Sequence, residues 1–568
     1  MKRVSRILAL MLVLVAVVGM FSVVSAQEEG VFIQDGQAFG ENDVPTLDPS
    51  LASDTSSVAV IGNTSIPLTN INELTLEVEP GFATDWTYDE ESRTYTFSLL
   101  EGVPWVEYDA DLGEVVEVVD ENGEVRIVTA SDFAYGITRT LAPDTAADYQ
   151  YVLSPYVDGL EVEDGAVASI EGALVNAVDD FTLEITVPEE VAGVGFIPAI
   201  FGLWFTSAQP EWLIAEFGET WIEDENIQSY GPFVVSEWLN DESLTMVTNP
   251  FWPGTDFVPQ ASVDGVTINV LSESVSLAEF EAGNLDIAAV PATDIPRIQS
   301  DPALSEAFYV APGTCTYYYG YNVEKAPFDD VRVRQAFSLS INRQSLSDNV
   351  LQGGQPPAAF FARPELAAAP DQTMTPGEGV PFTDDYEADA AAAGELLQSY
   401  LDDQGITAEE LPPITLMHND SELHASVAQA VQQMWADALG VDVSITTQEW
   451  GVYLETLNND APQIWRLGWC LDFPDAHNFL FDVHHSSNSP RTNFISDEFD
   501  ALVEEARLLT DTEARRDLYT QADDLISWEQ ASVAPIYYYT TLRMFSDRFD
   551  FEPSRNQKEA YYKWTLAE

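Results

Sequence analysis

The sequence predicts a large α/β protein that folds into two or three domains. Its 568 residues exceed what one hydrophobic core usually serves, and 46% of them are hydrophobic, which is enough for several cores. Segments in which apolar and polar residues alternate are interspersed with segments whose apolar residues recur at helical spacing. Strand and helix patterns that alternate in this way are typical of α/β folds.

The chain begins with the pattern of a secretory signal peptide. Basic residues near the start precede an apolar run over residues 7–24, and small residues stand at positions 25 and 26. This order predicts export to the periplasm or the cell surface, with cleavage after Ala26. The apolar run is also long enough to serve as an uncleaved membrane anchor, and that alternative stays open.

The charge of the chain is strongly negative. Against 96 Asp and Glu residues stand 22 Lys and Arg residues, which gives a formal net charge of -74. Such a charge repels phosphate groups, so we expect no nucleic acid partner. A surface this acidic and poor in lysine suits high salt, where the repulsion between carboxylates is screened. A secreted protein kept soluble by its excess charge is the alternative.

The first half of the chain predicts mainly strands. Apolar and polar residues alternate over 74–86 and 93–105, and a helical pattern follows over 131–143. Residues 107–128 are acidic and rich in valine, and they contain Asn122-Gly123, a dipeptide typical of tight hairpin turns, so we expect an additional acidic hairpin. Further strands are expected at 176–190, 231–238, 243–252 and 261–271, and a helix leading into a strand at 276–290.

The second half predicts amphipathic helices between strands. Asp329 and Asp330 can cap a helix over 331–341, because carboxylates accept hydrogen bonds from the first backbone N–H groups of a helix. Residues 352–381, rich in Pro, Gly and Ala, are expected to form a surface connection. A helix over 423–438 that ends at Gly440, a strand at 441–450 and a short helix at 450–457 are expected to follow.

A strand at 463–473 has two faces of different character. Because side chains alternate, one face is suited to a core and consists of Trp465, Leu467, Trp469, Leu471 and Phe473. The other face carries Arg466, Gly468, Cys470 and Asp472. A row of this composition is typical of the wall of a polar cleft, and equally of an edge strand with a solvated face.

This strand and several other segments resemble a known family. GWCLDF at 468–473 and CTYYYGYNVEKAPFDDVRVRQAF at 315–337 are similar to the oligopeptide-binding proteins of ABC importers, in the dipeptide and oligopeptide group of extracellular solute-binding proteins. Further agreement lies in PGFATDWTYDEESRTYTFSLLEGVPW, YGPFVVSEW, NPFWPG, SELH followed by QEW, and APIYYY. The segments follow the family's order along most of the chain, which makes the resemblance more specific than one short motif.

The resemblance implies an α/β periplasmic-binding-protein-like fold (type II, cluster C), in which three lobes close around ligand by a hinge. Lobe I would comprise residues 27–71, 206–314 and 541–568, lobe II residues 72–205, and lobe III residues 315–540. The implied function is capture of short peptides and their delivery to the transmembrane permease of an ABC transporter. We expect a monomer without cofactor or enzymatic activity. Another small solute, such as an oligosaccharide, a metal complex or a cell-wall peptide, remains the alternative ligand.

The resemblance also assigns residues to the two ends of a peptide. Asp472 matches the family's aspartate that pairs with the free amino group, since an ammonium that leaves water needs a charged partner. A turn-capping aspartate in DFPD is the alternative. Arg466 and His424 match positions that bind the peptide carboxylate, directly or through water. The chain departs from the family at Leu457, where an arginine is expected, and at Gly320, where a glutamate is expected, so one route for binding the carboxylate is absent.

Aromatic and backbone positions complete the expected site. Trp450, Trp469 and Tyr149 match aromatic positions that line side-chain pockets. Strand alternation, however, places Trp469 on the core face unless Gly468 allows a bulge. The backbone segments that flank a bound peptide in the family match Gly468 and Cys470, and Ser53 to Thr55.

The two cysteines of the chain, Cys315 and Cys470, match a disulfide of the family. Export to an oxidising compartment favours such a pair. Two buried free thiols are the alternative.

Metal binding and catalysis have weaker signals. His477, His484 and His485 lie near carboxylates, but their spacing matches no tight metal motif, so we expect no metal site. The chain contains no GxSxG, HExxH, P-loop or Gly-rich dinucleotide motif. A secreted carboxylate hydrolase is therefore the alternative with the least support.

Overall fold

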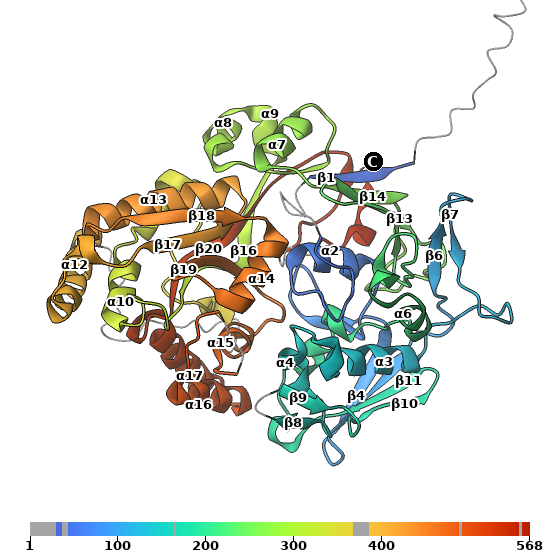
Figure 1. Cartoon of the computed structure of the whole chain (residues 1–568). Helices are drawn as coiled ribbons and strands as arrows, with labels where there is room; N and C mark the ends of the chain where they lie inside the picture. Colours follow the sequence, from blue (N-terminus) through green and yellow to red (C-terminus); the bar gives the residue numbers. More distant parts are fainter. Residues whose placement is uncertain are drawn as a thin grey trace, which may run out of the picture.

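The computed structural model describes residues 30–36, 44–163, 166–366, 385–487, 491–555 and 559–567. The predicted leader and residues 367–381 of the predicted surface connection lie outside these ranges. Within them, no helix is both long and apolar enough to cross a membrane. Helices and strands are mixed throughout, so the α/β class predicted from the sequence is confirmed (Figure 1).

One mixed sheet of ten strands connects the two halves of the molecule. In sheet order the strands are β12 (Phe233–Leu239), β13 (Ser243–Thr248), β14 (Gly265–Asn269), β1 (Phe32–Gly36), β15 (Ile287–Ala289), β20 (Val533–Phe545), β16 (Phe308–Tyr321), β19 (Ile464–Cys470), β17 (Ile414–Asn419) and β18 (Val443–Gln448). The long antiparallel strands β16 and β20 stand in the middle. One end of this pair lies beside β15 and the other end lies beside β19, so β16 and β20 are shared by both halves (Figure 1).

Residues 72–205 contain a separate antiparallel sheet of four strands. Its order is β10 (Val175–Asp179), β11 (Thr182–Thr186), β5 (Thr94–Leu99) and β4 (Ala83–Asp89). Helix α3 (Ala130–Leu141) begins with a capping box formed by Thr129 and Asp132, and it packs on β10 and β11 through Phe133, Ile137 and Leu141. Shorter elements nearby are β2 (Thr69–Ile71), β3 (Val78–Pro80), β8 (Glu161–Glu163), β9 (Ala166–Ser169), α4 (Gln150–Leu153) and α5 (Ile197–Ile200).

The acidic hairpin predicted at 107–128 is present and projects from the edge of the molecule (Figure 1). Strands β6 (Val106–Asp109) and β7 (Glu114–Glu117) form its first turn. A second turn follows, in which Val119 pairs with Val125 around Asn122-Gly123. Gly123 has a φ of 81°, a conformation that glycine adopts without strain, which explains the preference for this dipeptide.

Helices cover the part of the sheet that contains β17, β18 and β19. Asp330 caps α10 (Val331–Leu339), as predicted, and Gly440 ends α13 (Glu422–Leu439) with a φ of 67°. The other helices of this region are α11 (Arg343–Leu346), α12 (Tyr386–Gln404), α14 (Trp450–Asp460), α15 (Ala476–His484), α16 (Asp497–Leu508) and α17 (Thr512–Asp524). The opposite half contains α2 (Thr55–Thr64), α6 (Glu211–Phe217), α7 (Glu273–Glu281), α8 (Ile295–Ser300), α9 (Pro302–Ala307), β21 (Phe549–Asp550) and β22 (Thr565–Leu566).

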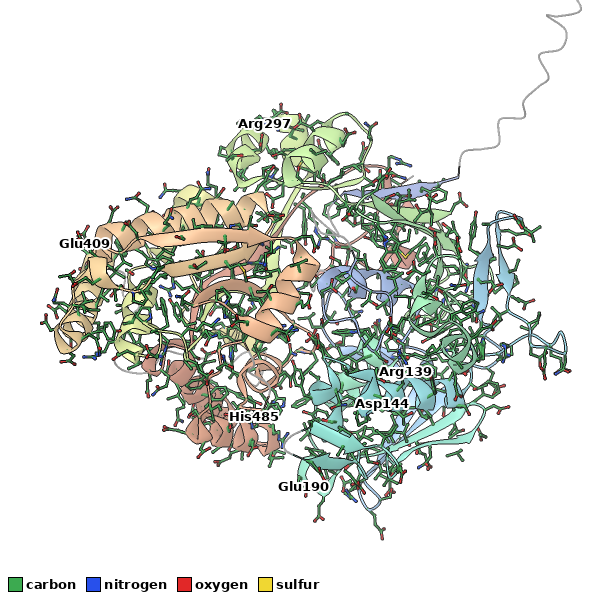
Figure 2. All side chains as sticks on the ribbon, in the orientation of Figure 1. Arg139, Asp144, Glu190, Arg297, Glu409 and His485 are labelled. Carbon is green, nitrogen blue, oxygen red and sulfur yellow. A yellow bond between two sulfur atoms is a disulfide. The ribbon has the colours of Figure 1, made fainter. Side chains whose placement is uncertain are left out.

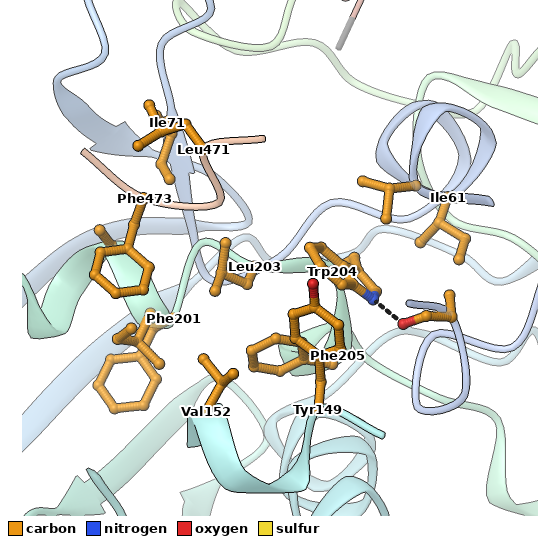
Figure 3. Close-up of a cluster of buried hydrophobic side chains, with 14 of the residues drawn as sticks. Ile61, Ile71, Tyr149, Val152, Phe201, Leu203, Trp204, Phe205, Leu471 and Phe473 are labelled. Carbon is orange, nitrogen blue, oxygen red and sulfur yellow. Dashed lines mark hydrogen bonds between the residues drawn. The ribbon is translucent and has the colours of Figure 1, made fainter. Parts of the chain in front are cut away.

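The apolar face predicted for the strand at 463–473 is buried along its whole length. Its last two members, Leu471 and Phe473, leave the sheet and pack against the 72–205 segment, near Tyr149, Val152 and Leu203 (Figure 3). The opposite face is not a solvated edge, because the Arg466 side chain is only 6% exposed. Strand β19 also lies between β16 and β17, and Gly468, Cys470 and Asp472 are partly buried, so the interpretation as an edge strand with a solvated face is wrong.

Acidic side chains are distributed over the outer surface. Asp144 and Glu190 are exposed on the 72–205 segment, and Glu409 is exposed at the far side of the other half of the molecule (Figure 2). The carboxylates are spread over the fold rather than gathered in one tail, so their mutual repulsion opposes the compact state as a whole.

We expect the unfolding midpoint to rise when KCl is added, because salt screens the repulsion among these carboxylates. Thermal unfolding followed by circular dichroism over a KCl series checks this. The same series near pH 4, where many carboxylates become protonated, is expected to show a weaker dependence. A flat or falling midpoint through molar KCl at neutral pH would contradict the halophilic interpretation of the composition.

Candidate ligand-binding site

A disulfide fixes the end of strand β19. Cys315 of β16 and Cys470 of β19 stand opposite each other in the antiparallel pair and are bonded, which confirms the predicted pairing. No free cysteine is present in the described chain. The bond holds β19 at the point where the chain turns toward Asp472.

Free-thiol titration of the denatured, unreduced protein is therefore expected to detect no thiol. Reduction before the same titration is expected to release two thiols, one from each cysteine. Two thiols in the unreduced protein would show that this bond does not form.

One edge of β19 is open for backbone hydrogen bonds. On that side β17 pairs with β19 only through Ile464 and Trp465, and none of the described strands continues the pairing up to Cys470. The Cα atoms of Cys315 and Cys470 are 4.0 Å apart, which is the spacing of a non-hydrogen-bonded antiparallel pair. The N–H and C=O groups of Cys470 therefore point away from β16, and by alternation those of Gly468 point the same way.

Asp472 lies just beyond the end of this edge, half-buried. Its backbone N–H donates to Asn478 Oδ1 at 3.0 Å, and its carboxylate oxygen Oδ2 accepts from Asn478 Nδ2 at 3.0 Å. The position of Asp472 is thus set by α15, which follows it in the chain. A carboxylate held in this way is a fixed partner for a cation.

A second carboxylate shares the same amide group. Asp482 is 2% exposed, and its Oδ2 accepts from Asn478 Nδ2 at 3.1 Å. Burial raises the pKa of Asp482 well above its ordinary value, and the negative charge of Asp472 adds to this shift. The raised pKa means that the neutral form of Asp482 is favoured next to Asp472.

Arg466 lies on the same strand, four residues before Cys470, and is buried among neutral groups. Its guanidinium donates to Asn419 Oδ1 at 3.1 Å and to the Tyr539 hydroxyl, and it lies over the Tyr317 ring. Its Nε has no hydrogen-bond partner within the described chain. None of the ion pairs formed by described residues includes Arg466, so this buried cation has no carboxylate partner of its own.

Two histidines accompany Arg466. His424, in the first turn of α13, packs edge-on against Tyr317, with ring centroids 5.6 Å apart. Burial and the charge of Arg466 lower the pKa of His424 well below its ordinary value. His418 is also buried, and its Nδ1 donates to the Asn419 carbonyl oxygen at 2.7 Å. Both imidazoles are therefore neutral next to the guanidinium.

The two departures from the family pattern have structural causes. A Cβ atom at Gly320 would lie 2.1 Å from the Trp465 ring, so no larger residue fits there unless Trp465 moves. Leu457 is fully buried in the apolar core. Neither position can supply a charged group to a ligand in this packing.

The first-lobe segment reaches the site through Asp54. The Asp54 carboxylate caps α2 by accepting from Ser56 N at 3.0 Å and from Ser57 N at 3.1 Å. It also accepts a hydrogen bond from the Ser57 hydroxyl at 2.7 Å, and the Trp450 side chain, at the start of α14, lies close enough to favour its charged form. Burial raises the pKa of Asp54. Its neighbours Ser53 and Thr55, predicted to flank the ligand, are half-buried and exposed.

Tyr149 and Trp469 meet across the two halves. Their rings are nearly parallel, with centroids 6.4 Å apart and an interplanar angle of 7°. The pairing of β16 with β19 runs without a register shift, so β19 has no bulge at Gly468. Trp469 remains on the core face as alternation predicts, and from there it contacts Tyr149.

The three histidines that were considered as metal ligands differ in their surroundings. His477 and His484 are buried, while His485 is only partly buried, beside Glu504. Burial lowers the pKa of His484 to about 3. No group of three or more His, Cys, Asp or Glu side chains suited to a metal ion occurs in the described ranges.

Several residues of the site were not found from the sequence. Three of them bond predicted site residues directly: Asn478 bonds Asp472, and Asn419 and Tyr539 bond Arg466. Asp482 and His418 bond Asn478 and Asn419 in turn. The only sequence signal for Asn478 and Asp482 was that they are polar residues a few positions after GWCLDF. Tyr539 carries no local signal, because its contact with Arg466 joins residues 73 positions apart.

Comparison with known proteins identifies the family of this chain. Residues 77–491 match the family described as bacterial extracellular solute-binding proteins, family 5 Middle. The oligopeptide-binding protein OppA of Bacillus subtilis (strain 168) is 33% identical over 502 residues, which cover 87% of this chain and 86% of that protein. The periplasmic murein peptide-binding protein MppA of Escherichia coli (strain K12) is 29% identical over 527 residues, covering 92% and 90%.

Solved structures show the same fold. The structure of the Escherichia coli murein tripeptide binding protein MppA matches with a TM-score of 0.81 and 26% identity, over 95% of this chain and 99% of that one. The unliganded open form of MppA matches over the same shares with a TM-score of only 0.60. The predicted periplasmic-binding-protein-like fold is thus confirmed, in an arrangement unlike that open form. The chain belongs to the bacterial extracellular solute-binding proteins of family 5, whose members bind solutes.

Proposed function

We propose that this protein captures short peptides outside the membrane and delivers them to the permease of an ABC transporter. The observation that carries the proposal is the open edge of β19. At one end lies a buried cation that forms no ion pair with another described residue, and beyond the other end lies a fixed carboxylate. An extended peptide has the same three features: a backbone, an ammonium and a carboxylate. A site that binds these common features accepts many sequences.

The amino end of the peptide would be bound by Asp472. An ammonium group placed there exchanges water for a carboxylate whose direction is set by Asn478. Trp469 and Tyr149 would form the apolar wall beside it.

The carboxylate end would be bound by Arg466, with His424 and His418 beside it. A buried guanidinium without an anionic partner is costly, and a ligand carboxylate would supply that partner. Four strand steps separate Arg466 from Cys470, about 13 Å, and Asp472 lies two residues further.

The peptide backbone would pair with the open edge between these ends. Gly468 and Cys470 direct their N–H and C=O groups toward it, as argued from the spacing of the cysteines. A Cβ atom at Gly468 would lie 3.1 Å from the Tyr539 hydroxyl, so glycine also preserves the approach of Tyr539 to Arg466. From the other side, Ser53 to Thr55 would flank the peptide.

The predicted lobes would close around the peptide by a hinge motion. Lobe II (72–205) contacts lobe III (315–540) through Tyr149 on Trp469 and Phe196 on Phe473. Strands β16 and β20, shared with lobe I, are the continuous connections through which a hinge would act. Ligand that binds both lobes would favour the closed arrangement.

The remaining properties follow from the same proposal. The chain would be exported, cleaved after Ala26, and act as a monomer that releases its peptide unchanged. Its acidic surface would keep it dispersed in the surrounding medium, including medium of high salt.

Mass spectrometry of ligand released from the purified protein tests the function. We expect a mixture of short peptides, and we expect added peptides to remain intact after long incubation with the protein. Release of a single oligosaccharide or metal complex, with no peptide binding in calorimetry, would replace the peptide by that solute. Cleaved peptide would instead indicate a hydrolase.

A further inference from the structure

Asn478 uses every hydrogen-bonding position of its side chain within the amino-end region. Its Oδ1 accepts from the Asp472 backbone N–H at 3.0 Å and from Trp469 Nε1 at 3.3 Å. Its Nδ2 donates to Asp472 Oδ2 at 3.0 Å and to Asp482 Oδ2 at 3.1 Å. Asn478 is fully buried, so water does not compete for these bonds.

The orientation of this amide follows from its partners. A backbone N–H and an indole N–H can only donate, so they must face Oδ1, and the carboxylate oxygens must then face Nδ2. One neutral side chain thus satisfies two donors and two acceptors at once. A carboxylate in its place could not donate the two bonds to Asp472 and Asp482. An apolar residue would remove all four hydrogen bonds.

We propose that Asn478 is the positioning residue of the amino-end site, which holds the Asp472 carboxylate in the place where it meets the ligand's ammonium. This inference rests on the proposed function. Asn478 does not contact the ligand itself. It acts through Asp472, and through Trp469 it joins that anchor to the contact with Tyr149 in the other half of the molecule.

The arrangement also gives Asn478 an electrostatic role. Asp472 and Asp482 would repel each other if nothing stood between them, and the two N–H groups of one amide stabilise both carboxylate oxygens. The side chain therefore fixes the direction of Asp472 without neutralising its charge.

The test compares a free tripeptide with its N-acetylated form by calorimetry, at pH 7.5 and pH 5.5, in the full-length mature protein. The readout is the dissociation constant of the N-acetylated peptide divided by that of the free peptide. This ratio separates recognition of the ammonium from recognition of the rest of the peptide. For Asn478→Ala we expect this ratio to fall at least about tenfold. Asn63→Ala is the matched control, because Asn63 is equally buried and donates at 2.9 Å to the carbonyl oxygens of Ala59 and Glu559, away from the site.

Asn478→Asp supplies a readout that a purely structural role would not change. At pH 7.5 the introduced carboxylate cannot donate, and the ratio is expected to fall about as far as in Asn478→Ala. Placed between two carboxylates, the new group has a raised pKa, so at pH 5.5 a fraction is protonated and regains one donated bond. We expect the ratio for Asn478→Asp to be about fivefold higher at pH 5.5 than at pH 7.5, a larger rise than in the wild type.

The outcomes separate this inference from the function on which it rests. Wild-type protein that binds no peptide would overturn both. Wild-type protein that discriminates between the two peptides, together with an Asn478→Ala variant that discriminates equally well, would overturn only the role of Asn478. An equal loss in Asn63→Ala, or no acid recovery in Asn478→Asp, would likewise show that the effect is one of general packing.

Discussion

Asp472→Asn is expected to weaken the binding of peptides with a free amino terminus by about 2 to 5 kcal/mol. The substitution keeps the size of the side chain and removes its charge, so a desolvated ammonium loses its ionic partner. Asn478 also has to donate to a neutral amide oxygen in place of a carboxylate. Isothermal titration calorimetry with a free tripeptide measures the change directly.

Two controls define what this result means. N-acetylated peptides lack the ammonium, so they should bind the wild type poorly and bind the variant about equally poorly. Asp437→Asn removes one carboxylate from an exposed position on α13 and should leave both affinities unchanged, which accounts for long-range charge effects. If acetylated and free peptides bound the wild type equally well, Asp472 would not be the anchor, and the peptide assignment itself would weaken.

Loss of the disulfide is expected to have an effect of similar size on stability. The bond closes a loop with a sequence separation of 155 residues. On the chain-entropy model a loop of that length contributes about 5 kcal/mol, an upper figure. The double variant Cys315→Ala and Cys470→Ala should therefore lower the free energy of unfolding by roughly 3 to 5 kcal/mol.

Urea unfolding of the double variant and of the oxidised wild type measures this loss. Wild-type protein reduced before unfolding is the matched control, since it lacks the bond and keeps both sulfur atoms. We expect it to resemble the double variant. Equal midpoints for the oxidised and reduced wild type would show that the bond adds no stability.

The elements that the sequence predicted well are those whose causes are local. The cap at Asp330, the helix end at Gly440 and the turn at Asn122-Gly123 each depend on a few consecutive residues. The buried face of the strand at 463–473 follows from side-chain alternation alone. Resemblance over most of the chain predicted the family and the disulfide, which the comparisons and the structure confirm.

Other features were inaccessible from local patterns. Arg466 faces Asn419 and Tyr539, which lie 47 and 73 positions away. Tyr156 reaches His477 across 321 positions. Such contacts depend on how the strands and lobes pack, and no periodicity within a window of the sequence reports on them.

By itself, the sequence determined that this protein is an α/β family 5 solute-binding protein with a disulfide between its two cysteines, and its resemblance to the family predicted roles for Asp472 and Arg466. Only the tertiary structure decided that none of the ion pairs between described residues includes Arg466, that Asn478 joins Asp472 to Asp482, and that Trp465 leaves no space for a Cβ atom at Gly320. The physical reason is that residue types and spacings encode local hydrogen bonds and buried faces, whereas the charge balance and free space of a site depend on distant segments that meet only in the folded chain.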